Sequence, residues 1–219
     1  MSAWSYSSLT AFETCPRRYH LTRILKTVKE PQTEATLHGN QVHKALEDAV
    51  RDSTPLPQKY AQYTPLVTAV LAAPGLKHTE MKFGLTQAYA PTGFFADDVW
   101  CRGVLDLTVV QHGTVTIIDW KTGKPKSDTD QLKLFAAAAF AMHQHATTVR
   151  TGYAWLAYNR IDTEVFHRGD VPTLWGGFLP RVKRLDAAVA SGTFPPRPSG
   201  LCKAWCPVDK SQCEFSGKQ

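Results

Sequence analysis

The order of helical and strand patterns along the 219-residue chain predicts an α/β fold. Helical patterns come first, a β-rich stretch follows, and a helix, further strands and a long helix come after it. The composition is that of a globular protein, because 43% of the residues are hydrophobic and 20% are charged. We therefore expect a single domain over residues 1–219.

Two helices are expected in the first third of the chain. The first spans about Ser8–Thr14 and begins after Ser7 or Ser8, whose hydroxyl groups suit an N-cap. The second runs from about Gly39 to Val50, where apolar residues recur at helical spacing. Residues 51–77 contain four prolines and are expected to form an insertion with at most a helical turn or two.

Strands and helices alternate in the rest of the chain. The expected elements are a strand at Glu80–Leu85, a hairpin from Val104 to Lys121, an alanine-rich helix at Gln131–Met142, strands at Tyr153–Tyr158 and Glu164–Phe166, and a long helix at Leu174–Ala190.

The hairpin brings two carboxylates and one amine together. If His112-Gly113 forms a two-residue loop, Asp106 falls opposite Asp119, with Cβ atoms about 4.5–5.5 Å apart on one face. Lys121 shares that face, because it lies two residues further along the strand. Facing like charges destabilise a sheet unless a cation lies between them, so this register predicts a divalent metal. The alternative is that one aspartate is solvated at a strand end.

The charge of the chain favours a polyanionic partner, since the net charge is +6 and the pI is about 9.1. The basic span from Arg17 to Lys29 suits either a nucleic-acid groove or an ordinary solvated face. The longest nearly apolar run, Leu134–Met142, is too short to cross a bilayer, and no basic segment followed by an apolar one opens the chain. We expect a cytoplasmic protein with no membrane partner.

Four of the five cysteines suggest a metal site. Cys202, Cys206 and Cys213 crowd the C-terminal region, and Cys15, which precedes a proline, is the natural fourth ligand of a tetrahedral site. Four thiolates suit zinc or an iron–sulfur cluster. Cys101 stands alone and is expected to be a small core residue.

A series of short motifs, modest singly but specific in their order, runs through nearly the whole chain. They are Ser5-x-Ser7-x-Leu9-x-x-Phe12-x-x-Cys15-Pro16-x-x-Tyr19, Gly39-x-x-x-His43, Glu80, Gly103-Val104-Leu105-Asp106, Asp119-Trp120-Lys121 and Gln131. The chain therefore resembles the RecB-like branch of the PD-(D/E)xK nuclease superfamily, and most closely the CRISPR-associated and phage exonucleases with C-terminal cysteines. The tyrosine that usually follows the glutamine by four residues is Phe135 here.

The resemblance implies a restriction-endonuclease-like core, with a mixed β-sheet flanked by helices. It also implies a four-iron four-sulfur cluster held by Cys15, Cys202, Cys206 and Cys213, which would join residues 1–30 and 195–219 in one cysteine-cluster region. The spacing of the C-terminal cysteines departs slightly from the commonest family pattern, so zinc stays an alternative.

The implied activity is metal-dependent hydrolysis of DNA, exonucleolytic and on single-stranded ends. Asp106 and Asp119 would hold Mg²⁺ or Mn²⁺, and Lys121 would position the attacking water or stabilise the transition state. His43 would add a nitrogen ligand and Glu80 a further carboxylate. Judged without the family, His43 is more often a structural or surface histidine, and Glu80 a charge at a strand edge.

The remaining expectations concern nucleic acid and partners. Gln131 would bind the DNA backbone or support the metal site, and its alternative is a helix-capping role. Arg18 and Tyr19 are candidate DNA contacts. Protein partners from DNA recombination or CRISPR adaptation, and a bacterial, archaeal or phage origin, would fit this family. The rival function is a non-catalytic nucleic-acid-binding or partner-docking protein with a structural zinc site.

Overall fold

The computed structural model describes residues 3–217. The chain forms two compact units, one made of the residues up to Thr33 and from Gly177 onward, the other of Glu34–Gly176. The boundary falls inside helix α6, Val171–Ser191. The expected single nuclease domain over residues 1–219, with its cysteine-cluster region and its insertion, stays a prediction.

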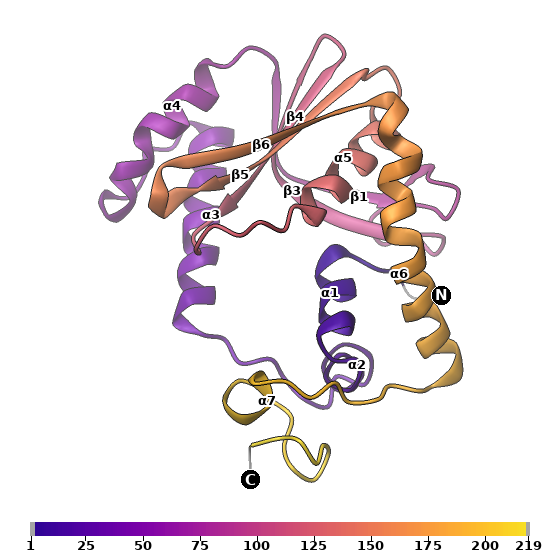
Figure 1. Cartoon of the computed structure of the whole chain (residues 1–219). Coiled ribbons are helices and arrows are strands. Elements are labelled where there is room, and N and C mark those ends of the chain that lie inside the picture. Colours follow the sequence, from indigo (N-terminus) through magenta and orange to yellow (C-terminus); the bar gives the residue numbers. More distant parts are fainter. Residues whose placement is uncertain (1–2, 218–219) are drawn as a thin grey trace. The chain divides into compact units, whose positions relative to one another are not determined.

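The unit Glu34–Gly176 contains a six-stranded sheet (Figure 1). Its elements are α3 (Glu34–Asp52), the 3-10 helix η2 (Gln58–Tyr63), α4 (Thr64–Ala72), β1 (Leu76–Leu85), β2 (Pro91–Thr92), β3 (Cys101–Gln111), β4 (Thr114–Lys121), α5 (Asp130–Met142), β5 (Thr148–Trp155), the 3-10 helix η3 (Leu156–Tyr158), β6 (Arg160–His167), the 3-10 helix η4 (Arg168–Asp170) and the start of α6. The strands lie in the order β2-β1-β3-β4-β5-β6. The pair β4–β5 is parallel and the other neighbours are antiparallel, which confirms a mixed sheet.

Helices cover both faces of this sheet. Trp120 and its neighbour across the ladder, Ala154, pack in one core cluster with the apolar face of α3. Tyr153 precedes Ala154 on β5 and therefore points to the opposite face, where it packs with Leu132 of α5. Both layers are needed to bury a sheet of this kind, because each face of the central strands is apolar.

The β3–β4 hairpin has the register that its loop predicts. Gln111 pairs with Thr114 around His112-Gly113, and the ladder continues in step as far as Leu107. Both loop residues have positive φ, 38° at His112 and 78° at Gly113, as a two-residue hairpin loop of the primed type requires.

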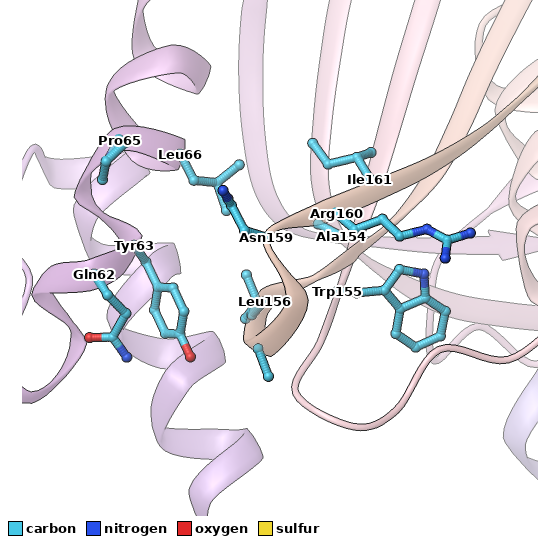
Figure 2. Close-up of a pocket in the computed structure, with 11 residues that line it drawn as sticks. Gln62, Tyr63, Pro65, Leu66, Ala154, Trp155, Leu156, Asn159, Arg160 and Ile161 are labelled. Atoms are coloured by element: carbon cyan, nitrogen blue, oxygen red, sulfur yellow. The ribbon is translucent and has the colours of Figure 1, made fainter.

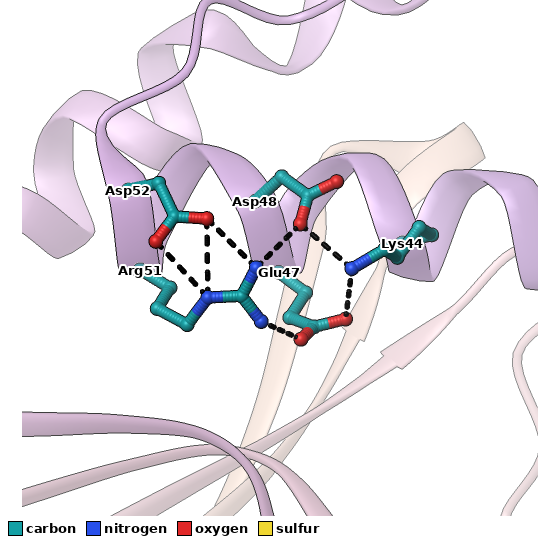
Figure 3. Close-up of polar contacts among 5 residues, drawn as sticks. All are labelled: Lys44, Glu47, Asp48, Arg51 and Asp52. Carbon is teal, nitrogen blue, oxygen red and sulfur yellow. Dashed lines mark hydrogen bonds and ion pairs between the residues drawn. The ribbon is translucent and has the colours of Figure 1, made fainter.

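Several elements are longer than their sequence patterns indicate. Helix α3 extends beyond both expected ends, and a chain of ion pairs along its outer side (Figure 3) adds a few tenths of a kcal/mol per pair at i,i+3 and i,i+4 spacing. These residues are Lys44, Glu47, Asp48, Arg51 and Asp52. The proline-rich stretch is largely helical, because Pro57 precedes η2 and Pro65 occupies the first turn of α4, where no amide donor is needed.

The other unit contains α1 (Tyr6–Thr14), α2 (Pro16–Tyr19), the π-helix η1 (His20–Ile24), the rest of α6 and α7 (Leu201–Ala204). The expected N-cap at Ser7 or Ser8 is wrong: Ser5 caps α1, and its hydroxyl accepts from the Ser8 amide while the Ser8 hydroxyl accepts from the Ser5 amide. This reciprocal pair is a capping box, in which Ser8 takes the place of the usual Glu or Gln. Over the part of the chain that the structure describes, the helices lack the length and apolar character needed to cross a membrane.

Candidate active site

The sheet and two of its helices bring six of the expected site residues into the unit Glu34–Gly176. They are His43 on α3, Glu80 on β1, Asp106 on β3, Asp119 and Lys121 on β4, and Gln131 on α5. The two aspartates lie where the β3–β4 ladder ends.

The expected cross-strand pair of Asp106 and Asp119 is not part of the ladder, whose last pair is Leu107 with Ile118. In a regular continuation the Trp120 amide would donate to the main chain of β3. It donates instead to Asp106 Oδ2, at 2.8 Å. The two strands therefore separate at the carboxylates, although their charges still interact.

Three possible metal ligands, Asp106 among them, lie close together. One donor atom from each of His43, Glu80 and Asp106 lies within 4.8 Å of the others, and His43 Nδ1 is 3.4 Å from Asp106 Oδ2. Burial lowers the pKa of His43, but the hydrogen bond and charge of Asp106 outweigh it and the net pKa is raised. Burial, followed by the charges of Asp106 and Glu47, raises the pKa of Glu80. The two carboxylates of Glu80 and Asp106 lie close together and partly shielded from water, an arrangement that suits a divalent cation.

The backbone is irregular at Glu80. Its φ is +49°, and it is missing from the β1–β3 ladder, which pairs Thr79 with Leu107 and Met81 with Leu105. A residue with a Cβ atom in this region is held there at a cost of about 1–2 kcal/mol. Asp106, which would pair with Glu80, is consequently without a ladder partner on either side.

Asp119, Lys121 and Gln131 form a hydrogen-bonded group beside these ligands. Gln131 Nε2 donates to Asp119 Oδ1 at 3.0 Å, and Gln131 Oε1 accepts from Lys121 Nζ at 3.0 Å. Lys121 Nζ also lies 2.5 Å from Asp119 Oδ2, an ion-pair distance, but Oδ2 is buried and has no partner with hydrogen-bond geometry. Burial, and then the charge of Asp106, raises the pKa of Asp119 to about 6 against the opposing charge of Lys121.

Tyr153 is a site residue that the sequence pattern does not single out. Lys121 Nζ lies 5.1 Å from the centre of its ring, within the range of a cation–π contact. Phe135 is buried edge-on against Phe83, with ring centres 6.5 Å apart. The position of the usual family tyrosine thus belongs to the core, and the aromatic neighbour of the lysine comes from β5.

A cavity of about 380 Å³ lies at the end of β5, the strand that pairs with β4 (Figure 2). Its lining includes Ala154 and Trp155, which pair with Trp120 and Lys121 across the β4–β5 ladder. On the other side, Figure 2 shows Tyr63 and Leu66 from η2 and α4 facing the turn between β5 and β6.

The four cysteines expected to bind metal line one small pocket in the other unit. Main-chain amides donate to two of them, from Arg197 to Cys15 Sγ at 3.4 Å and from Ser199 to Cys202 Sγ at 3.3 Å. Burial raises the pKa of the Cys206 thiol. Among the described residues, no three cysteine sulfurs lie within 4.8 Å of one another. Cys101 is fully buried in the sheet unit, as expected for a core residue.

The two expected DNA contacts near the N-terminus are otherwise engaged. Arg18 donates to both carboxylate oxygens of Glu30, at 3.0 and 2.5 Å. Tyr19 is 7% exposed and packs edge-on against Phe12. A buried ring offers no surface for stacking on a base.

A family model, described as the PD-(D/E)XK nuclease superfamily, matches residues 3–90 and 74–214. Among solved structures, a candidate exonuclease from Eubacterium rectale superposes with a TM-score of 0.55 at 13% identity, over 91% of this chain and 85% of its own. The SSO0001 protein gives a TM-score of 0.49 at 16% identity, over 93% of this chain and 82% of its own. The first likeness concerns the fold alone. No curated protein sequence matches the chain.

Proposed function

Because this chain belongs to the PD-(D/E)XK nuclease superfamily, we propose that it is a divalent-metal-dependent deoxyribonuclease that acts as an exonuclease on single-stranded DNA ends. The observation that carries the proposal is the convergence of His43, Glu80 and Asp106 beside the Asp119–Lys121 pair. The exonuclease character and the single-strand preference come from the resemblance to the RecB-like branch.

The residues fit a resident Mg²⁺ or Mn²⁺. His43, Glu80 and Asp106 offer one nitrogen and two carboxylates, a donor set that suits Mn²⁺ or Mg²⁺. When bound, such an ion polarises a phosphate oxygen and lowers the pKa of a bound water.

Lys121 is the catalytic cation of this proposal. Gln131 and the ring of Tyr153 hold its ammonium group beside the carboxylates. A fixed positive charge in a site that excludes water stabilises the negative charge that develops on the phosphate, and removing such a group typically costs about 10²- to 10³-fold in rate. Gln131 acts as a positioning residue, because it contacts Asp119 and Lys121 at the same time.

End-labelled single- and double-stranded DNA, incubated with the purified protein and Mn²⁺, tests the nuclease. We expect loss of label from single-stranded ends by the wild type and none by Asp119→Ala. The matched control is Asp52→Ala, which removes an exposed carboxylate from the end of α3, outside the metal group. Absence of cleavage by wild type, or equal cleavage by Asp119→Ala, would leave the rival binding function as the better reading.

We also propose that Cys15, Cys202, Cys206 and Cys213 hold a four-iron four-sulfur cluster. The preference for the cluster over zinc comes from the resemblance to the exonucleases with C-terminal cysteines. A cluster bound to the folded state alone would also stabilise this unit.

Anaerobic purification distinguishes the two metals. We expect a brown protein that contains iron and acid-labile sulfide, loss of iron in Cys202→Ala, and full iron content in the buried control Cys101→Ala. A colourless protein that contains zinc and no iron overturns the cluster. Protein partners from DNA recombination or CRISPR adaptation, and a cytoplasmic site of action, remain proposals that rest on the family resemblance.

A further inference from the structure

A pair of aromatic residues, half-buried Phe94 and exposed Phe95, lies in the turn after β2. Phe95 is 78% exposed, and its ring meets that of Phe94 edge-on, with centres 4.8 Å apart. Two cations accompany the rings: the guanidinium of Arg102 is 5.1 Å from the centre of Phe94 and 5.7 Å from that of Phe95, and Lys82 Nζ is 5.7 Å from Phe94. We call Phe94, Phe95, Lys82 and Arg102 the aromatic–cationic patch.

Folding gives little reason for the exposure of Phe95, which is the most exposed large apolar side chain among the described residues. Burying such a ring would contribute about 1.5–3 kcal/mol, which this position forgoes. Arg102 is held in place, since its Nη1 donates to the Phe94 carbonyl at 3.3 Å and the residue is half-buried. An ordered cation beside an open aromatic face is suited to a ligand that has both a flat ring and a negative charge.

The patch lies on the strands that carry the metal group. Arg102 precedes Asp106 by four residues on β3, a distance of about 13 Å at 3.3 Å per residue. Arg102 and Asp106 are an even number of residues apart, so they lie on the same side of β3, opposite to the fully buried Cys101 and Leu105. Lys82 follows Glu80 by two residues on β1.

Two acidic residues lie close to this patch in the chain. Asp97 and Asp98 follow Phe95 in the same turn and are exposed, and Asp98 Oδ1 accepts from the Thr92 hydroxyl at 2.7 Å. The contacts of Lys82 and Arg102 are with the rings instead. Asp97 and Asp98 repel a polyanion, so its phosphates would lie on the side of β1 and β3, next to Lys82 and Arg102.

We propose that the aromatic–cationic patch binds the single-stranded part of a DNA substrate, with Phe95 stacked on a base and with Lys82 and Arg102 next to its phosphates. The distance of about 13 Å between Arg102 and Asp106 along β3 corresponds to two to four nucleotides, because stacked DNA rises about 3.4 Å per nucleotide and an extended strand about twice as far. The identity of the substrate rests on the proposed function. The patch itself is a second binding site, distinct from the residues that perform the hydrolysis.

Binding in a cleavage-deficient background tests this site. Fluorescence anisotropy of labelled oligothymidylate is measured with Asp119→Ala protein in Mn²⁺, alone and combined with Phe95→Ala, Phe95→Trp or Arg102→Gln. We expect Phe95→Ala to weaken binding roughly 5- to 140-fold and Phe95→Trp to restore it. Tyr158→Ala, which removes an aromatic ring that is 50% exposed at η3, is the matched control and should leave affinity unchanged.

Two readouts identify the contacts. Arg102→Gln should reduce the slope of log affinity against log salt by about 0.7, whereas Phe95→Ala should leave that slope unchanged. An abasic residue moved along the oligonucleotide should weaken binding at one position only, and Phe95→Ala should abolish that dependence.

The outcomes separate this site from the nuclease activity. Unchanged affinity in Phe95→Ala, or a flat abasic profile, overturns the patch even if wild type cleaves DNA. Stacking that depends on Phe95 in a protein whose wild type does not cleave supports the patch and refutes the nuclease. The patch is also overturned if the protein binds blunt duplex and single-stranded DNA equally well and Phe95→Ala changes neither affinity.

Discussion

Because the φ of Glu80 is positive, we expect the glycine variant at this position to be more stable than the alanine variant, the reverse of the usual order in a strand. In an ordinary strand, glycine is less stable than alanine by about 0.5–1 kcal/mol because it loses more backbone entropy on folding. At φ +49° alanine keeps a strain of about 1–2 kcal/mol that glycine lacks. We therefore expect Glu80→Gly to be more stable than Glu80→Ala by about 0.5–1 kcal/mol, or roughly 1–4 °C in Tm for a chain of this size.

Urea unfolding in EDTA measures this difference without a metal contribution. The control is the neighbouring Thr79, which pairs regularly with Leu107 and should show the ordinary order, with Thr79→Ala above Thr79→Gly. Both Glu80 variants lose the same carboxylate, so Mn²⁺-dependent cleavage should fall equally in the two. The comparison thus separates the backbone at Glu80 from its ligand role.

One result would refute this reasoning. If alanine is the more stable residue at Glu80 as well as at Thr79, the left-handed conformation is not maintained and Glu80 pairs with Asp106 as an ordinary strand residue. The three-donor group would then need a different arrangement of β1.

The other predictions concern the centre and the thiols. Lys121→Met should reduce kcat about 10²- to 10³-fold while the affinity for single-stranded oligonucleotide, measured by anisotropy, changes little. Gln131→Ala should lower the free energy of unfolding in urea by about 1 kcal/mol, because it leaves Asp119 Oδ1 and the Lys121 ammonium each without one hydrogen bond. Gln131→Glu should lower it further in the same assay, because it places a second carboxylate beside Asp119. Cys101 should resist iodoacetamide in the native protein and react only after unfolding, as read by mass spectrometry, because burial raises the pKa of its thiol and removes it from solvent.

Sequence periodicity predicts the β3–β4 hairpin well because its information is local. A two-residue loop at His112-Gly113 determines every later pair, and the alternation of apolar residues determines the faces. The same rule predicts that Asp106 and Asp119 pair, and that step is wrong because a side chain competes with the main chain for the Trp120 amide. Such competition depends on the three-dimensional position of a carboxylate, which periodicity does not contain.

The remaining parts of the site come from distant segments. Glu80 appeared from the sequence to be the less certain ligand, yet it belongs to the three-donor group, while Asp119 lies with Lys121 and Gln131. Tyr153 reaches Lys121 because β5 lies parallel to β4, a pairing that needs a crossover through α5. Contacts of this kind follow from topology, and only a family resemblance or a structure provides them.

The position of the backbone irregularities gives an independent argument that this group of residues is functional. Asp106 lies on a central strand, where regular pairing on both sides would be the more stable arrangement, yet both ladders omit it. On the β1 side Glu80 is held at positive φ, and on the β4 side the Trp120 amide donates to the Asp106 carboxylate instead of to the main chain. Strain of this kind persists only where the surrounding structure enforces it, and it concentrates at functional sites. Two such departures flanking one half-buried carboxylate are difficult to explain by packing, whereas both are explained if the site presents Glu80 and Asp106 to a common ligand.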